Sequence, residues 1–156
     1  MTDYTNSYFK MMSDIGEGYE RARAIRKAEK DALMKADDWD GVKAWNEREK
    51  AFPFPFSSGA MKAYRAWQNS TANESSCFEV NGLPWAKDAH DFITTLQEAG
   101  ITEFAITDRS TALMELIHVL ADEEGCILVG ICTVTRSEKR WGEEGTEEYE
   151  GILMSL

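Results

Sequence analysis

The sequence is poor in the residues that build metal sites and disulfides. Its 156 residues include three cysteines and two histidines, and none of them shows the spacing of a zinc site. Cys126 and Cys132 lie on one expected strand, about 20 Å apart at ~3.3 Å per residue, so they cannot bridge each other. Cys77 could reach either one, but we favour three buried thiols in a reducing compartment. We therefore expect no metal and no cofactor.

Long apolar runs are also missing. No stretch approaches the ~20 apolar residues that a membrane-spanning helix needs. The first residues, MTDYTNSYFKMMSD, lack the basic segment followed by an apolar run that marks a secretory signal. The sequence therefore predicts a cytoplasmic protein that does not enter a membrane.

Positive charge is scarce in the C-terminal half. Residues 1–84 hold 13 acidic and 12 basic side chains, whereas residues 85–156 hold 15 acidic and 5 basic ones, so nearly all of the net charge of −11 lies in the second half. Nucleic acids and anionic membranes bind basic surfaces, and we expect neither as a direct partner. The charge fits a basic protein partner, or it serves solubility alone.

Residues 101–136 show the clearest secondary-structure pattern. Phe104 and Ile106 point to one side while Glu103 and Thr107 point to the other, as in a strand with one buried face. A helix with one apolar stripe follows, and Gly125 stands where a left-handed residue ends a helix. Residues 126–134 are almost continuously apolar, which predicts a strand covered on both faces. The spacing predicts a right-handed β-α-β crossover between two parallel strands.

The flanking segments extend this pattern to a small body. Phe78–Val80 indicates a short strand, and a second helical stripe begins at Trp85 and ends before Gly100. Residues 137–148 predict a charged loop, and residues 149–156 a final strand antiparallel to the one before it. The predicted body is a two-layer β-α-β-α-β-β arrangement in which helices cover a small mixed sheet.

The N-terminal part has helical patterns. Residues 3–15 and 19–36 both suit helices, and we expect Gly16 and Gly18 to weaken or break the chain between them. The second pattern has a thin apolar stripe, which suits a helix that lies across a surface or packs on another chain. Asp38 is a candidate N-cap for a further short helix.

A domain boundary is predicted near residue 75. Ser57 or Ser58 can cap one more helix, which ends in the polar, breaker-rich segment NSTANESS at residues 69–76. We therefore predict an α+β protein with a helical N-terminal arm at residues 1–72 and an α+β body at residues 77–156.

The segment FPFPF at residues 52–56 is unusual. Proline restricts its own φ and disfavours helix in the residue before it, so the segment is extended. Phe52, Phe54 and Phe56 either attach the arm to the body or dock a partner. Trp141, in the expected charged loop, is a further candidate for binding a partner.

The C-terminal pattern resembles a known kind of domain. It reads AGITEFAITDRSTALMELIHVLADEEG, then a CILVGICTVTR strand, then WGE and a closing EGI strand. In this respect residues 85–156 resemble small uncharacterised domains from bacterial mobile elements. The resemblance implies no activity and transfers no catalytic residue.

One edge of the expected sheet could bind a ligand. Ligands of sheets with parallel strands bind beyond the carboxyl ends of the strands. That edge holds Arg109, Ser110 and Thr111, with Arg136 alongside, and these groups could hold a phosphate or a carboxylate. Asp108 opposes an anion, no glycine-rich phosphate loop occurs, and helix caps or surface charge explain the same residues.

No catalytic residue stands out. We expect His90 and His118 to form local hydrogen bonds, and an apolar strand makes the thiols inert. Two classes of function follow. The first is a non-enzymatic interaction protein that docks another protein or a second copy of itself, in its sharpest form an acidic decoy for a nucleic-acid-binding protein. The alternative is a small ligand-binding or enzymatic domain that uses the edge near Arg109.

Overall fold

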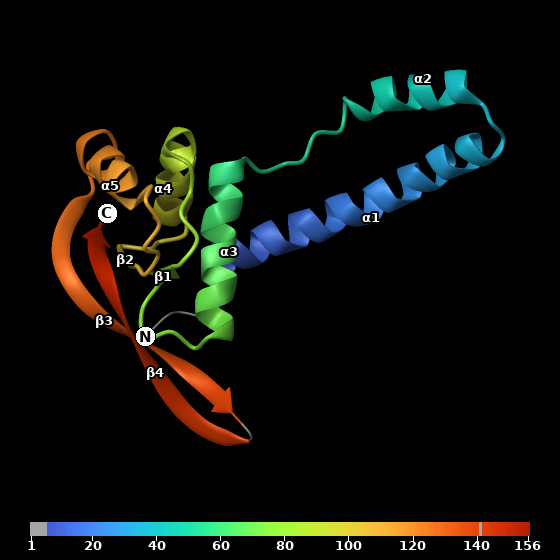
Figure 1. Cartoon of the computed structure of the whole chain (residues 1–156). Coiled ribbons are helices and arrows are strands. Elements are labelled where there is room, and N and C mark those ends of the chain that lie inside the picture. The colour runs from blue at the N-terminus through green and yellow to red at the C-terminus, as the bar shows by residue number, and fades with distance from the viewer. Residues whose placement is uncertain (1–5, 141) are drawn as a thin grey trace. The chain divides into compact units, whose positions relative to one another are not determined.

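The computed structural model describes residues 6–140 and 142–156, without the side chains of residues 138–140 and 143. It confirms an α+β fold with a helical N-terminal region and a mixed four-stranded sheet (Figure 1). The chain forms two compact units, one at Lys10–Phe56 and one that joins the chain up to Phe9 with Ser57–Leu156. The predicted domains, 1–72 and 77–156, stay a prediction, but the helix at 58–72 groups with the sheet.

The unit at Lys10–Phe56 is a helical hairpin. Helix α1 (Ser7–Lys35) is continuous, so of the two effects expected of Gly16 and Gly18, to weaken or to break the helix, the break is wrong. Each glycine weakens a helix by about 1 kcal/mol relative to alanine, but it keeps its backbone donor and acceptor, and a helix of 29 residues tolerates two. Helix α2 (Trp39–Glu49) begins after Asp38, whose side chain accepts from the Gly41 N–H, as predicted.

Polar and aromatic contacts hold this hairpin together. Arg26 of α1 forms a half-buried ion pair with Glu49 of α2 at 2.9 Å, and the Trp45 indole donates to the Arg26 carbonyl oxygen. The FPFPF segment returns along α1. The Phe54 ring lies edge-on to Tyr19 at 5.2 Å, and the Arg26 guanidinium lies 4.5 Å from the centre of the Phe52 ring. Phe54 follows Phe52 in the chain but contacts Tyr19, which precedes Arg26, so the two segments run antiparallel.

The second unit contains the sheet and the predicted β-α-β-α-β-β order. Its elements are α3 (Ser58–Ala72), β1 (Glu79–Val80), a 3-10 turn (Ala86–Asp88), α4 (Ala89–Glu98), β2 (Glu103–Ile106), α5 (Leu113–Asp122), β3 (Ile127–Arg140) and β4 (Glu143–Ser155). In Figure 1 the helices α3, α4 and α5 lie side by side, next to the strands. The first turn of α1 joins them, because Phe9 stacks on Trp67 at 5.4 Å and on Phe78 at 6.1 Å.

The core lies where these helices meet the sheet. Phe92 of α4 and Phe104 of β2 meet edge-to-face at 6.0 Å, and both are fully buried. Gly59 lets α3 approach α4 closely, because a Cβ atom there would lie 2.4 Å from the Asp88 carbonyl oxygen. The sequence places Trp85 in the α4 stripe, but it precedes the 3-10 turn and is exposed.

The strand order corrects the predicted crossover. The order is β1-β2-β4-β3, with β1 parallel to β2 and both β2 and β3 antiparallel to β4. Strands β2 and β3 therefore run in the same direction, as predicted, but they are not neighbours. The final strand, β4, lies between them and pairs with both. This pairing joins residues far apart in the sequence, so local periodicity does not predict it.

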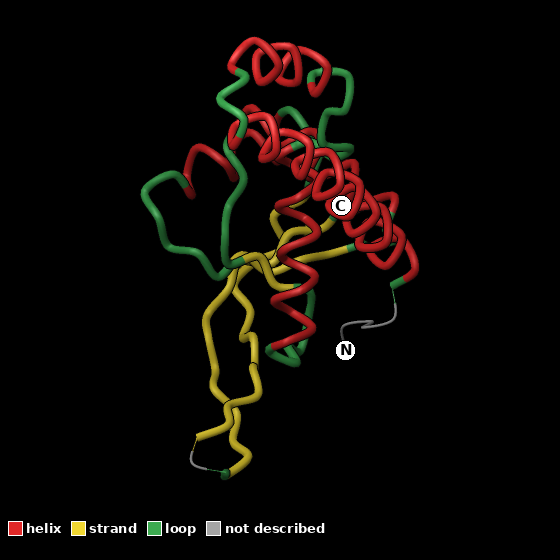
Figure 2. Tube along the Cα trace, turned by 90° about the vertical axis from the view of Figure 1, so that its right-hand side faces the viewer, coloured by secondary structure: helices red, strands yellow, loops and turns green. Residues whose placement is uncertain are grey.

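Strands β3 and β4 form one long ribbon. Their pairing continues from Ile127 opposite Ser155 to Arg140 opposite Glu143, so the charged loop predicted at residues 137–148 is wrong. Figure 2 shows this ribbon extending beyond the shorter strands. The antiparallel direction of the last strand is confirmed.

The sheet curls back towards the segment before β1. The Ser76 N–H donates to the Thr135 carbonyl oxygen at 2.9 Å, and the Ser137 N–H donates to the Asn73 carbonyl oxygen at 2.8 Å. Both bonds lie on the side of β3 that faces away from β4. The linker predicted at residues 69–76 is therefore wrong, since α3 includes its first half and its second half lies along β3.

The turns around the helices follow the sequence in part. Ser57 caps α3 as predicted, and Gly100 and Gly125 both have positive φ, 77° and 72°. By contrast α5 has no side-chain cap, because Asp108 accepts instead from the nearby Ser110 N–H at 2.7 Å. Within the described ranges, no helix is long and apolar enough to cross a membrane.

Candidate interaction surface

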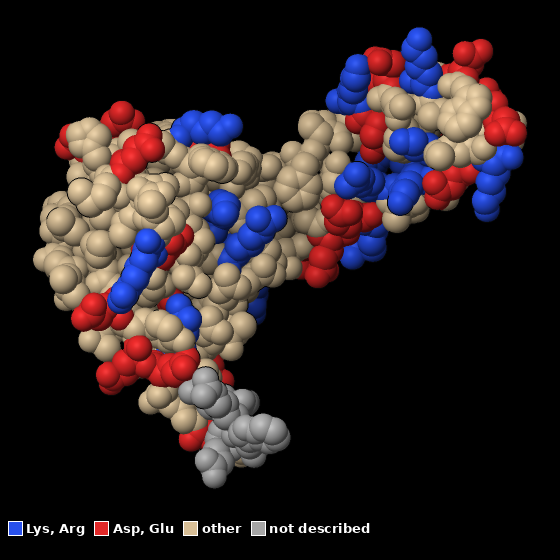
Figure 3. Space-filling model, viewed as in Figure 1, with Lys and Arg blue, Asp and Glu red and all other residues tan. Residues whose placement is uncertain are grey.

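The apolar half of β3 lies in solvent. Ile127, Leu128, Val129 and Ile131 are 65%, 55%, 57% and 82% exposed, and we call these four residues the apolar edge. The prediction that both faces of this strand are covered is therefore wrong. An apolar run suits a central strand, but β3 is the last strand of the sheet and has a sheet neighbour on one side only. Figure 3 shows mostly uncharged atoms where Figure 1 draws the first half of β3.

The backbone beside the apolar edge is open as well. The N–H or C=O groups of Thr135 and Ser137 point away from β4, towards residues 73–76. Backbone groups alternate in direction along a strand, so those of Thr133 and Ile131 point to the same outer side. Within the part of the chain that the structure describes, they have no backbone partner there. The register shift between Leu128 and Gly130 leaves Val129 unopposed, as in a β-bulge.

A small pocket adjoins this edge. It has a volume of about 120 Å³, and its apolar lining includes Ile106, Leu113, Ile131 and Ile152. Its polar lining consists of Thr107, Asp108, Arg109 and Glu150. Arg109 and Glu150 approach to 3.6 Å, but both side chains are about three-quarters exposed, so this ion pair contributes little to stability.

Acidic side chains lie beside the apolar edge on β4. Thr133 stands opposite Glu150 and Thr135 opposite Glu148, and directly opposed residues project from the same face of a sheet. Ile131 shares that face, since it precedes Thr133 by two residues. Glu148 and Glu150 are both exposed. On this face the apolar residues Leu128 and Ile131 stand opposite Met154 and Ile152, and the two acidic residues follow further along β4.

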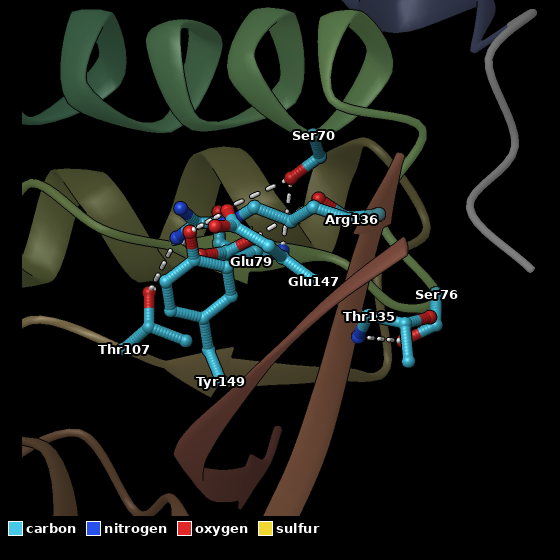
Figure 4. A network of polar contacts seen from close by, with 9 residues as sticks. Ser70, Ser76, Glu79, Thr107, Thr135, Arg136, Glu147 and Tyr149 are labelled. Atoms are coloured by element: carbon cyan, nitrogen blue, oxygen red, sulfur yellow. Dashed lines mark hydrogen bonds and ion pairs between the residues drawn. The ribbon is translucent and has the colours of Figure 1, made fainter. Parts of the chain in front are cut away.

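The opposite face of the sheet holds a buried ion pair (Figure 4). The Glu79 side chain is 3% exposed, and its carboxylate accepts hydrogen bonds from Arg136, from the Thr107 hydroxyl at 2.6 Å and from the Ser75 hydroxyl at 3.0 Å. The Arg136 Nε lies 2.9 Å from a Glu79 oxygen, and its guanidinium lies 3.8 Å from the centre of the Tyr149 ring.

The pKa of Glu79 reflects this environment. Burial raises the pKa of the carboxyl, but the hydrogen bonds from Arg136, Thr107 and Ser75 together lower it below its ordinary value. The group is therefore a charged, hydrogen-bonded carboxylate on β1 that contacts Arg136 of β3 and Thr107, the residue after β2. These contacts stabilise the sheet, and they hold the Arg136 side chain against Glu79.

The structure separates the predicted ligand residues. Arg109 lines the pocket, and Ser110 and Thr111 are exposed in the turn before α5. Arg136 is not among the pocket residues and contacts Glu79 instead. Anion binding by these four residues stays a prediction.

Three of the four predicted partner-binding residues lie outside the sheet unit. Phe52, Phe54 and Phe56 belong to the helical hairpin, where Phe52 and Phe54 are 48% and 39% exposed. Trp141 lies outside the described residues. Their binding role stays a prediction too.

The three thiols have raised pKa values, and both imidazoles contact a carboxylate. Burial is the main cause that raises the pKa of all three cysteines, with Cys77 reaching about 11, although Cys126 alone is fully buried. His118 contacts Asp122 one helical turn away at 3.0 Å, as predicted, whereas His90 contacts the distant Glu124 at 3.0 Å, so the local bond predicted for His90 is wrong. Among the residues that the structure describes, no cluster of side chains could hold a metal ion.

Sequence reasoning misses two features of this surface. It assigns the apolar edge to the core, because a run without charges looks the same in a central strand and in an exposed one. It gives Glu79 no role, although an acid between Phe78 and Val80 in a short buried strand must find a partner. An acidic residue flanked by apolar residues in a short strand is therefore the sequence pattern that could have predicted this buried ion pair.

Comparisons with known proteins match most of the chain to a family. A family described as a domain of unknown function (DUF7698) matches residues 62–156. No curated protein and no solved structure matches the chain. The matched range begins inside α3 and includes the whole sheet, the pocket and the apolar edge.

Proposed function

The chain belongs to this family of domains of unknown function, and from the geometry of its sheet we propose that it is a non-enzymatic protein-interaction domain. The observation that carries the proposal is the apolar edge of β3. Edge strands are normally protected by charge, proline or a covering segment, and large apolar patches on a free protein surface commonly mark binding sites. Residues 127–133 contain no charge and no proline, and a bulge at Val129 is the one feature among them that disfavours edge pairing.

Covering the apolar edge can supply a large part of the free energy of binding. Full burial of one Ile, Leu or Val side chain contributes about 1.5–3 kcal/mol. The four side chains of the apolar edge are between 55% and 82% exposed. Covering them contributes roughly 4–8 kcal/mol before the costs of association are subtracted. A specific complex of moderate affinity therefore needs only a few further contacts.

Site-specific photo-cross-linking tests the proposal. A photoreactive residue replaces Ile131, and in a matched control it replaces Ile25, which is 76% exposed on α1 in the other unit. In cells that express the protein, we expect a defined cross-linked product from position 131 that Leu128→Lys removes. Equal products from both positions, or none from position 131, would contradict an interaction at the apolar edge.

The finer assignment concerns the partner and its setting. We propose a cytoplasmic accessory factor, in line with the resemblance to domains from bacterial mobile elements. Its acidic half supports a role as a decoy that occupies a basic, nucleic-acid-binding protein, because residues 85–156 carry 15 acidic and 5 basic side chains. Competition with DNA for such a protein should weaken as salt rises. Binding that does not respond to salt would rule the decoy out.

A second candidate is anion binding at the pocket. The supporting observation is that a pocket of about 120 Å³ is lined by Arg109 at the carboxyl end of β2, the edge that the sequence singled out. Asp108 and Glu150 line it too and oppose an anion. Titration with inorganic phosphate tests this candidate. Heat of binding that Arg109→Ala removes would support it, and the absence of heat with the unaltered protein would exclude it.

A further inference from the structure

The free edge of β3 has a backbone and a charge pattern that together specify the kind of partner. We propose that this edge binds an extended segment of another protein, rich in both apolar and basic residues, which adds to the sheet as a fifth strand beside β3. The inference rests on the proposed function, because it uses the same apolar edge. It goes further in naming the conformation and the chemistry of the partner.

The backbone groups favour an extended partner. Ile131 and Thr133 direct N–H and C=O groups outward, and within the described ranges these have no backbone partner on that side. Only a chain in β conformation satisfies such a row of alternating donors and acceptors. The row is limited by residues 73–76, which already occupy the edge at Thr135 and Ser137. The added strand therefore lies along residues 127–133, about 23 Å at ~3.3 Å per residue.

The side chains along this edge favour apolar residues in the partner. Leu128 and Ile131 project from the face that also bears Ile152, which lines the pocket with Ile131. A strand placed beside β3 has side chains about 4.5–5.5 Å from those directly opposite, close enough for van der Waals contact. Apolar residues opposite Leu128 and Ile131 therefore cover the exposed part of the edge.

The neighbouring charges favour a basic partner. Glu148 and Glu150 share the face of Ile131 and Thr133, one strand further in. An added strand lies two strand spacings from β4, about 9–10 Å. Thr133, whose side chain is short, stands between the added strand and Glu150, so a long Lys or Arg side chain opposite Thr133 can extend across β3 towards Glu150 and diagonally towards Glu148. Acidic side chains at the same positions would be repelled.

The charges also argue against a second copy of the chain as the occupant. Residues 127–133 contain no basic residue, so a second β3 strand offers nothing to Glu148 and Glu150. Two copies would also bring together chains that each have a net charge of −11. A basic segment gains from the same field that opposes self-association.

A peptide selection tests the inference on the full-length protein. A phage-displayed library of random dodecapeptides is selected on the unaltered protein, and binders that also bind Ile131→Lys are discarded. Ile131 is 82% exposed, so this substitution is not expected to disturb the fold. We expect the remaining peptides to combine apolar residues with an excess of Lys and Arg. Ile25→Lys is the matched control and should retain the same binders.

Two measurements on the strongest peptide separate the parts of the inference. Methylation of alternate backbone nitrogens on one edge of the peptide should weaken binding at least about tenfold, since more than one hydrogen bond is lost. The double variant Glu148→Gln/Glu150→Gln should weaken it about two- to fivefold per charge at low salt. The control Glu115→Gln/Glu123→Gln removes two exposed charges from the same unit and should have a smaller effect.

The possible results distinguish this inference from the proposed function. Peptides without an excess of basic residues, or a methylated peptide that binds equally well, would overturn the inference and leave the apolar edge as a binding surface. The same holds if no peptide depends on Ile131 but light scattering shows a dimer that Ile131→Lys dissociates. If neither a peptide nor a second copy depends on Ile131, both proposals fail.

Discussion

Replacing Arg136 by methionine should destabilise the sheet unit strongly. The substitution keeps most of the side-chain volume but removes the charge that faces Glu79. Glu79 is 3% exposed, so its carboxylate would remain buried without a counter-charge. A double substitution that removes both charges leaves no buried ion behind. The two experiments therefore separate the cost of an unpaired charge from the value of the ion pair itself.

The magnitude follows from the contacts that Glu79 retains. Removing one partner of a buried ion pair typically costs 3–5 kcal/mol, on the order of a third of a small domain's stability. Hydrogen bonds from Thr107 and Ser75 still stabilise the carboxylate, which places Arg136→Met near the lower end, about 3 kcal/mol. With a urea slope of ~2 kcal/mol/M, the unfolding midpoint should fall by roughly 1.5 M.

Urea unfolding followed by circular dichroism measures this change. The control is Arg109→Met, which breaks an exposed ion pair with Glu150 in the same unit and should cost less than about 1 kcal/mol. The double variant Glu79→Leu/Arg136→Met should recover much of the loss. If Arg136→Met costs no more than the control, or if the double variant is as unstable as the single one, the reasoning about a buried ion pair is refuted.

Three further predictions concern packing, pH and thiol reactivity. Gly59→Ala should destabilise the protein by about 1–3 kcal/mol, because the new Cβ would clash with backbone atoms of α4 and of the turn before it. Gly16→Ala has open space around the new Cβ and should stabilise the protein by about 0.5–1 kcal/mol. Thermal unfolding of the two variants measures both changes. The pKa of Glu79 is lower in the folded protein than its unfolded value of about 4.3, so the carboxylate stabilises the fold above that value. This stabilisation is lost as the pH falls through the folded pKa. As the pH is lowered below ~4, the urea midpoint should therefore fall less steeply for Glu79→Leu/Arg136→Met than for the unaltered protein. Cys77 has a pKa of about 11, so it should react slowly with iodoacetamide at pH 8 in the folded protein and quickly in urea; equal rates would contradict its burial.

Local signals in the sequence predict the elements but not their neighbours. The order of strands and helices in the body, the caps at Asp38 and Ser57, and the left-handed residues Gly100 and Gly125 are all confirmed. Each depends on a few adjacent residues whose side chains or backbone angles act locally. The insertion of β4 between β2 and β3 depends on pairing between distant residues, and no local pattern specifies it.

The errors at the candidate surface have the same origin. Composition alone assigns residues 126–134 to a covered strand, whereas the exposure of Ile131 depends on its place at the end of the sheet. Charge alone assigns residues 137–148 to a loop. In the structure residues 137–140 pair with residues 143–146 across the ribbon, and charged residues suit a ribbon that extends beyond the core.

Amide hydrogen exchange at Ile131 and Thr133 tests the central claim most directly. It is measured by NMR on the free protein and on its complex with the strongest selected peptide. The account predicts rapid exchange of both amides in the free protein and at least about tenfold slower exchange in the complex, with Ser137 little changed because its N–H is already bonded to Asn73. Unchanged exchange at Ile131 and Thr133, with new protection at the FPFPF segment or around Arg109, would place binding elsewhere and contradict the account.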